Sequence, residues 1–175
     1  MIRVVKKMTK RRPSIQITSS ARNGQELEAP ISSMYQSLHA DVAALLEPEG
    51  LYFTFHQEDD DHCEKNYDTS VMGKFKCLNT SCPFKGWSSK HIPITIRLYA
   101  GQRYNARVYH QRCKGCSYPS HPTLDNSYAE RIAYRIREWL GIQQDRPPYG
   151  GRTELPHNQD LCEGCRAGHC LLVNQ

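Results

Sequence analysis

The sequence lacks the segments that would export a chain or insert it into a membrane. Residues 1–30 contain neither the apolar core nor the small-residue cleavage site of a secretory signal. No run approaches the ~18 consecutive apolar residues that a membrane-spanning helix requires. We therefore expect an intracellular protein, cytoplasmic or nuclear, with no membrane span.

Hydrophobic side chains are also scarce, at 38% of the 175 residues. That share is low for a domain stabilised by its apolar core alone. Bound metal would compensate, because structural zinc contributes about 10–16 kcal/mol of apparent binding free energy in small modules.

Acidic residues are absent from two long stretches, which separates the charge along the chain. The net charge is +5. Residues 1–24 contain seven Lys/Arg and no acid, and residues 69–124 contain nine and no acid. Eleven acids lie between residues 25 and 68, among them the run Glu58-Asp59-Asp60-Asp61. This run is expected to be a solvated loop; binding of a cation and masking of a basic surface are the alternatives.

The basic segment 1–30 has few large apolar side chains and is expected to be a disordered arm. Its cluster Lys6-Lys7-Met8-Thr9-Lys10-Arg11-Arg12 is typical of a nuclear-localisation patch. The acid-free composition also fits a mitochondrial presequence. A solvated tail without either role is the third interpretation.

Seven of the eight cysteines form one pattern of close pairs. The pairs are Cys77/Cys82, Cys113/Cys116 and Cys162/Cys165, with Cys170 and His157 near the third. Zinc binds soft thiolates in a tetrahedron, and short knuckles supply two thiolates at a time. Disulfides are the alternative, but the missing secretory signal and the two-residue spacing favour metal. Seven cysteines and one histidine complete two closed sites, so the sequence predicts two structural Zn²⁺ ions per chain.

A β-hairpin decides which cysteines share a metal. Apolar residues alternate over 92–98 and again over 104–108, with a turn at 100–103 between them. The returning strand would bring Cys113 and Cys116 to the end of the hairpin where Cys77 and Cys82 lie. This arrangement is that of a zinc ribbon.

The expected ligand sets follow from this hairpin. The first site is expected to contain Cys77, Cys82, Cys113 and Cys116, and the second His157, Cys162, Cys165 and Cys170. Two alternatives stay open: His169 could replace His157, and pairs could be exchanged between the two sites. Cys63 is left over and is expected to be a free thiol, although His62-Cys63 could supply a ligand.

Helical spacing is present on both sides of the hairpin. One helix is expected to begin at Ser32 or Ser33 and to end at Pro48 and Gly50, followed by a strand over 51–56. A second helix is expected over 127–140, where Ser127 and Glu130 fit a capping box. Its buried stripe is expected to be Tyr128, Ile132, Ile136 and Trp139 or Leu140, with Arg131, Arg135 and Arg137 on a solvated face. The predicted fold class is α+β: a zinc-ribbon-like β-hairpin with flanking helices, stabilised by two structural zinc sites. The expected organisation is an arm over 1–30, a helix, strand and acidic loop over 31–68, and a zinc-binding domain over 69–175.

Several motifs of this chain resemble those of a known family. They are Gly73-Lys74-Phe75-Lys76-Cys77, Gly86-Trp87-Ser88-Ser89, Arg107-Val108-Tyr109-His110-Gln111-Arg112-Cys113-Lys114-Gly115-Cys116, Cys162-Glu163-Gly164-Cys165 and Gly168-His169-Cys170. Over residues 73–170 the chain resembles the 3CxxC-type zinc finger in its fungal form. That family includes the animal receptor-transporting proteins and the zygote arrest proteins.

The resemblance implies one of two roles. Receptor-transporting proteins are linked to the trafficking of membrane receptors, and zygote arrest proteins to RNA binding through their zinc domain. The chain departs from the family in its first pair, which has four residues between the cysteines. We also expect it to lack the membrane-anchoring tail of the receptor-transporting proteins, which does not favour the trafficking role.

We expect the chain to bind RNA or another single-stranded nucleic acid. The acid-free stretch 69–124 interleaves cations with aromatic residues, as stacking platforms for unpaired bases do. The residues expected to contact nucleic acid are Lys85, Lys90, Arg97, Tyr99, Arg103, Arg107, Tyr109 and Arg112. Several of them lie opposite the apolar face of the hairpin and can therefore be exposed. A protein partner, in an adaptor or trafficking role, is the alternative.

An enzyme is not expected. No proline precedes a cysteine pair, so half of the zinc deaminase signature is missing. No βαβ pattern flanks a cysteine pair, as a thiol oxidoreductase would require.

Overall fold

The computed structural model describes residues 30–147 and 157–172. The strands are β1 (Ser32–Met34), β2 (Thr54–Phe55), β3 (Lys65–Lys76), β4 (Gly86–Tyr99), β5 (Arg103–Tyr109), β6 (Gln111–Arg112), β7 (Pro119–Ser120) and β8 (Pro122–Leu124). The helices are α1 (His39–Leu46), α2 (Ser127–Trp139) and α3 (Glu163–Arg166), with short 3₁₀ turns η1 (Gln36–Leu38), η2 (Glu47–Glu49) and η3 (Gln159–Leu161). The predicted arm lies outside the described residues apart from Pro30.

One curved sheet organises the molecule, in the order β1-β5-β4-β3-β8, with β2 added in parallel to β5. The predicted hairpin is β4 and β5, whose pairs run from Ile94 with Val108 to Tyr99 with Arg103. Sequence patterning indicates only the last residues of β3, although this strand pairs with β4 along most of its length. Because β3 begins at Lys65, residues 31–68 and the zinc-binding segment share a single sheet.

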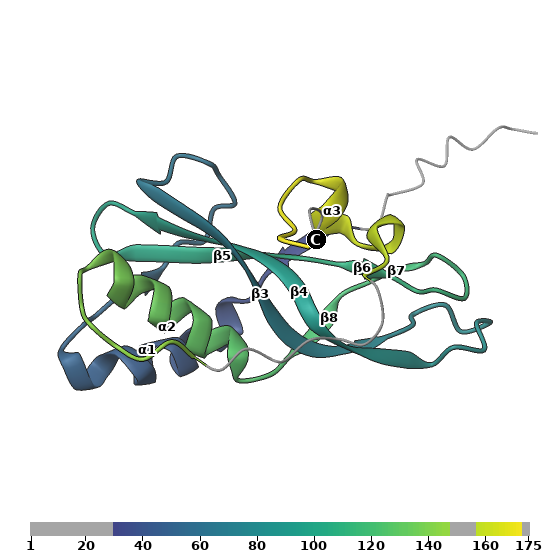
Figure 1. The fold of residues 1–175 in the computed structure, drawn as a ribbon, viewed down its shortest axis with the longest axis horizontal. Coiled ribbons are helices and arrows are strands. Elements are labelled where there is room, and N and C mark those ends of the chain that lie inside the picture. Colours follow the sequence, from purple (N-terminus) through teal and green to yellow (C-terminus); the bar gives the residue numbers. More distant parts are fainter. Residues whose placement is uncertain (1–29, 148–156, 173–175) are drawn as a thin grey trace, which may run out of the picture.

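The two faces of the sheet are covered by different parts of the chain (Figure 1). Helices α1 and α2 pack on one face, where alternate residues of β3, β4 and β5 form the apolar core. The fully buried members of this core include Val42, Leu46, Ile92, Ile94, Ile96, Tyr104, Val108, Ile132 and Ile136. Each such side chain contributes about 1.5–3 kcal/mol through burial, so this face stabilises the fold.

Helix α2 confirms the expected stripe, because Tyr128, Ile132 and Ile136 are buried against the sheet. Its N-terminus differs from the prediction. Asn126 is the N-cap, and the Oγ of Ser127 instead accepts a hydrogen bond from the backbone N–H of Met72 at 2.8 Å. The side chain that was expected to cap the helix therefore ties it to β3.

The first predicted helix begins later than expected. Ser32 and Ser33 belong to β1, which pairs with Tyr109 and Val108 of β5, and α1 begins only at His39. Pairing with the exposed edge of β5 satisfies the backbone here, so tertiary contact overrides the local helical spacing. The helical segment ends where predicted. Pro48 lies in the closing 3₁₀ turn η2, and Gly50 ends that turn with a left-handed φ of 68°.

The other face of the sheet is not open to solvent. The segment that follows β2 crosses β4 and β5 at one end, and the C-terminal segment with α3 covers the same face further along (Figure 1). Side chains from both segments contact this face: Asp59 bonds Arg97, and His169 bonds Asp68 and stacks on Tyr109. The fold therefore has three layers, and its middle layer is the sheet.

Candidate metal centres and the covered basic face

The first four predicted ligands meet at the end of the sheet. Cys77 follows β3, Cys82 lies in the loop before β4, and Cys113 and Cys116 belong to the turn between β6 and β7. Their Sγ atoms all lie within 4.8 Å of one another. The sulfurs of Cys77 and Cys116 are 3.6 Å apart, and those of Cys82 and Cys113 are 3.7 Å apart.

These separations distinguish a metal from a disulfide. Four sulfurs at 2.3 Å from a tetrahedral zinc are about 3.8 Å apart, whereas bonded sulfurs are about 2.05 Å apart. All eight cysteines are free thiols. The cluster thus has the donors and the spacing of a four-thiolate zinc site.

Backbone hydrogen bonds close the two loops that contain the four cysteines. The N–H of Cys77 donates to the carbonyl of Lys85 at 3.1 Å, which closes the first loop. The N–H of Gly115 donates to the Sγ of Cys113 at 3.4 Å, and the N–H of Cys113 donates to the carbonyl of Tyr118. These bonds shape the two loops that bear the four sulfurs.

Electrostatics also call for a cation in this cluster. Burial raises the pKa of Cys77 to about 12, whereas a hydrogen bond to the backbone of Tyr118 lowers that of Cys116 to about 7. Closely held thiolates repel one another, so they ionise together only when a positive charge balances them. A divalent soft ion supplies that charge.

The second predicted set also forms one cluster. His157, Cys162, Cys165 and Cys170 place their ligand atoms within 4.8 Å of one another. The Nε2 of His157 is 3.1 Å from the Sγ of Cys165 and 3.5 Å from that of Cys170. A nitrogen and a sulfur on one tetrahedral zinc would be about 3.6 Å apart. This cluster is therefore a three-thiolate, one-imidazole site, and the chain has two zinc sites.

The alternatives left open by the sequence are now decided. His169 points away from the second cluster, because its Nδ1 lies 2.9 Å from the Oδ2 of Asp68 and its ring stacks on Tyr109. No exchange of pairs occurs between the two clusters. Cys63 belongs to neither cluster, and its Sγ accepts a long contact of 4.0 Å from the side-chain amide of Asn66.

The second cluster is docked onto the sheet. Glu163 is 3% exposed and pairs with Arg112 of β6, and its N–H donates to the carbonyl of His110 at 3.1 Å. Gly164 lies directly on Pro93, where any side chain would collide with the proline ring. The second zinc site thus holds the segment that covers the outer face of β4 and β5.

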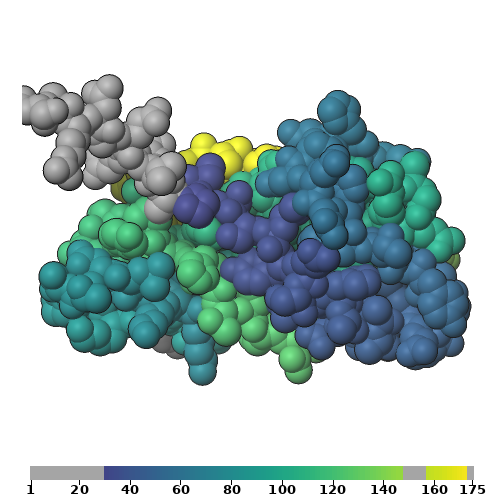
Figure 2. Space-filling model, turned by 180° about the vertical axis from the view of Figure 1, so that it is seen from behind, coloured from purple at the N-terminus to yellow at the C-terminus, as the bar shows by residue number. Residues whose placement is uncertain are grey.

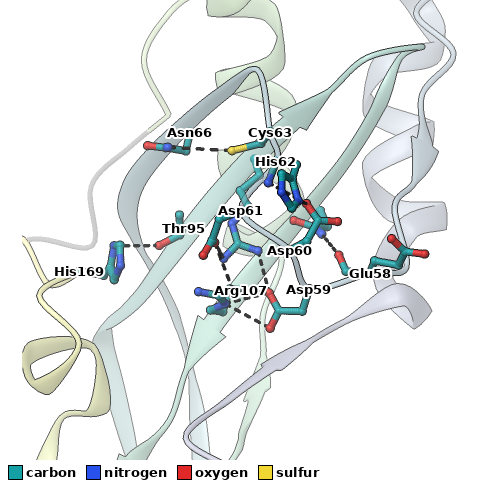
Figure 3. Close-up of polar contacts among 12 residues, drawn as sticks. Glu58, Asp59, Asp60, Asp61, His62, Cys63, Asn66, Thr95, Arg107 and His169 are labelled. Atoms are coloured by element: carbon teal, nitrogen blue, oxygen red, sulfur yellow. Dashed lines mark hydrogen bonds and ion pairs between the residues drawn. The ribbon is translucent and has the colours of Figure 1, made fainter.

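The residues expected to contact nucleic acid do not form one exposed face. Arg107 lies beneath the acidic loop (Figure 3), and Arg97 is bonded to the same loop. The Oδ1 of Asp59 is 2.7 Å from a guanidinium nitrogen of each arginine, and Asp61 lies 3.2 Å from Arg97. The side chain of Arg97 is only 2% exposed. Of the three interpretations of the acidic run, these contacts show the masking of a basic surface.

The two tyrosines of the set are buried as well. Tyr99 is 4% exposed, and its hydroxyl donates to the carbonyl of Asp60 at 2.9 Å. Tyr109 is 1% exposed beneath the ring of His169. The expectation that Arg97, Tyr99 and Tyr109 can be exposed is wrong, because two distant segments cover the face opposite the apolar one.

The remaining members of the set lie apart from one another. Lys85 is exposed in the loop before β4, and Lys90 is exposed within β4. Arg103 is exposed at the opposite end of β5, where its Nε donates to the carbonyl of Ala100 at 2.9 Å. Arg112 is half-buried in its pair with Glu163.

An exposed surface that the sequence did not single out surrounds the first cluster. We call it the tip surface, and it consists of Lys76, Leu78, Phe84, Lys85, Lys114 and Tyr118. Leu78, Phe84 and Tyr118 are 47%, 42% and 43% exposed. The Nζ of Lys114 lies 5.0 Å from the ring centre of Phe84, a cation–π contact. A signal was available, since all six residues lie within or beside the two cysteine loops.

Among the helices within residues 30–147 and 157–172, none is long and apolar enough to cross a membrane.

Comparison with known families bears on the metal sites. A family model described as a zinc-binding domain, Zn_ribbon_3CxxC, matches residues 70–168, which include seven of the eight ligands. Neither the curated proteins nor the solved structures gave a match. Because the matched segment is more than half of the chain, this protein belongs to the 3CxxC zinc-ribbon family of zinc-binding domains.

Proposed function

We propose that this zinc-binding module binds single-stranded nucleic acid, RNA foremost, through the tip surface. The observation that carries the proposal is the pairing of exposed aromatic rings with lysines around a rigid metal cluster. Phe84 and Tyr118 project from the two cysteine loops, and three lysines lie beside them. Unpaired bases stack on such rings for about 1–3 kcal/mol each, while the ammonium groups meet the phosphates.

The position of Phe84 is set by the loop opposite it. Gly115 lies against the ring, and any side chain there would collide with it. Two loops that are 30 residues apart in sequence therefore present one surface (Figure 2), in which the 77–85 loop (teal) and the 113–121 segment (green) lie at one end of the molecule. The first zinc holds both loops, so metal and binding surface are coupled.

Charge supports the same assignment. No acid lies between residues 69 and 124, and the acidic loop that neutralises Arg97 and Arg107 is bonded to the outer face of the sheet. The cations of the tip surface are thus left available to a polyanion. The resemblance to the zygote arrest proteins favours the same ligand class.

We further propose that the metals have no catalytic role. Both clusters already supply four protein ligands, and a closed site gives no coordination position to a substrate.

A protein partner is the second candidate, and one residue favours it. Leu78 is 47% exposed at the tip surface. An aliphatic side chain adds nothing to base stacking, but it would be buried in an apolar interface core.

The test is the binding of the zinc-loaded full chain to a fluorescent single-stranded RNA across a salt series. Replacing both Phe84 and Tyr118 by alanine keeps the charge and should weaken binding by at least about tenfold, with an unchanged salt slope. Replacing Lys85 and Lys114 by glutamine should lower the salt slope by about 1.4, at ~0.7 per phosphate contact. The matched control is Arg166→Gln, on the exposed surface of α3, which should change neither.

The basic arm is identical in every variant, so its contribution cancels in the comparison. Equal affinity of the aromatic variant and the wild type would exclude the tip surface as the stacking platform. Absence of binding by a chain that contains two zincs would favour the protein partner, to be sought as a stoichiometric, nuclease-insensitive complex.

A further inference from the structure

A polar cavity of about 230 Å³ lies between β3 and α2, at the end of the sheet away from the first zinc cluster. It is lined by Tyr67, Thr69, Arg131, Tyr134, Arg135, Glu138 and Arg146. We call it the arginine cavity. Within residues 30–147 and 157–172, the β3 residues 65–71 have a partner strand on one side only, because β8 pairs with β3 over residues 73–75. The cavity is therefore open beside a sheet edge.

The lining concentrates positive charge. Three guanidinium groups face one carboxylate, that of Glu138, which gives the lining a formal charge of two positive. The sequence assigns the α2 arginines to a solvated face, but Arg131 is 7% exposed, and its Nη1 donates to the carbonyl of Pro147 at 3.2 Å.

The guanidinium group of Arg135 is held rigidly. Its Cζ lies 3.2 Å from the ring centre of Tyr67, so the planar group stacks on that ring. Its Nε is buried, and among the described residues no hydrogen-bond acceptor reaches it. A buried donor without an acceptor is rare in native proteins and calls for a ligand or an ordered water.

Further donors surround this group. Tyr67, Thr69 and Tyr134 bring three hydroxyl groups to the same lining as Arg135 and Arg146. Guanidinium forks and hydroxyls together match the oxygens of a tetrahedral oxyanion.

We propose that the arginine cavity binds the phosphate group of a small phosphomonoester. Charge selects phosphate over carboxylate, because a phosphomonoester has about −1.5 to −2 charges at neutral pH and the lining has two positive ones. Size selects a small ligand. At ~30 Å³ per water the cavity holds about eight waters, and it is smaller than the ~300 Å³ at which sites for drug-sized ligands begin.

The experiment is calorimetric titration of the zinc-loaded full chain with inorganic phosphate, with glycerol phosphate and with acetate. Saturable binding of either phosphate, at least about tenfold tighter than acetate, is the expected result. Tighter binding of glycerol phosphate would identify a phosphomonoester as the ligand, and tighter binding of inorganic phosphate would identify the free ion. Acetate binding as tightly as both phosphates would overturn the proposal.

Variants assign the binding to the cavity. Arg146→Gln removes an exposed guanidinium and should leave the fold intact, and Arg135→Gln removes the stacked one. Each should weaken phosphate binding about tenfold or more, since hydrogen bonds to charged groups are the strong ones. Arg135→Lys keeps the charge without the fork and should be intermediate.

Lys74→Gln is the charge-matched control, because Lys74 is exposed on β3 outside the cavity. Equal loss of phosphate binding in this control and in Arg146→Gln would place the binding elsewhere and refute the proposal. Circular dichroism and zinc content, measured on each variant, identify any variant that fails to fold. If the Arg135 variants do not fold, the phosphate affinity of Arg146→Gln by itself decides whether the cavity is the binding site.

Discussion

Replacing Asp59 by asparagine should destabilise the fold more than any other single change in the acidic loop. The carboxylate of Asp59 bridges two arginines of adjacent strands, at 2.7 Å from Arg97 and 2.7 Å from Arg107. Asparagine has nearly the same shape and keeps one acceptor oxygen, so the substitution removes charge and little else.

The magnitude follows from the exposure of the partners. Removing one member of a fully buried ion pair costs about 3–5 kcal/mol, because the other charge is left in a dry site. The Arg97 side chain is 2% exposed, but that of Asp59 is 40% exposed, so solvent screens part of the interaction. Asp61 also stays within 3.2 Å of Arg97. We therefore expect a loss of about 1–3 kcal/mol for Asp59→Asn.

Asp61→Asn is the matched control. The side chain of Asp61 is 84% exposed, and pairs of that exposure contribute about 0–1 kcal/mol. In the double variant Arg97 has neither carboxylate, so the loss should exceed the sum of the two single losses.

The pH dependence gives a second, independent signature. Partial burial alone would raise the pKa of Asp59, but the hydrogen bonds from Arg107 and Arg97 outweigh it and hold the pKa below its usual 3.8. A lowered folded-state pKa means that Asp59 stabilises the fold at higher pH, and that this contribution is lost as pH falls through the lowered value. The stability difference between wild type and Asp59→Asn should thus be constant above about pH 5 and shrink below about pH 4.

The assay is urea unfolding of the zinc-saturated chain followed by circular dichroism. An Asp59→Asn variant no less stable than Asp61→Asn would refute the buried-pair argument. A difference between wild type and Asp59→Asn that does not change with pH would refute the assignment of the lowered pKa.

Three further predictions concern the metal sites and the core. Cys82→Ser should retain one zinc, whereas Cys63→Ser should retain two, as measured by metal analysis of the dialysed protein. Cys170→Ser should lose the second zinc and speed hydrogen exchange over residues 157–172, because that metal holds the segment on the sheet; unchanged protection there would show that side-chain contacts suffice. Ile132→Ala should cost about 2–5 kcal/mol in urea unfolding, since the side chain is fully buried. Leu140→Ala, at 48% exposure, should cost less than about 1 kcal/mol and serves as its control.

Local sequence determined the metal chemistry of this protein. A zinc knuckle is a short-range feature: its ligand types and its two- or four-residue spacing are sufficient to identify it. The same holds for the hairpin of β4 and β5 and for the buried stripe of α2, because period-two and helical spacings are visible within a few residues.

Grouping the ligands into two sites required one more inference, from the lengths of the hairpin strands. The choice of His157 over His169 was open in the sequence. The fold decides it, because Asp68 and Tyr109 hold His169 on the sheet.

Exposure was decided by the tertiary structure alone. Alternation along β4 correctly places Arg97 and Tyr99 opposite the apolar face, but alternation states only which face a residue is on. Whether that face meets water depends on segments far away in sequence, here the acidic loop before β3 and the zinc-bound segment after residue 157. Those contacts join residues that are far apart in sequence, such as Asp59 and Arg97, which are 38 positions apart. No local pattern encodes such pairing, so the covered basic face and the arginine cavity could be found only in the folded molecule. The tip surface differs, because its residues lie within or beside the cysteine loops that the sequence already shows.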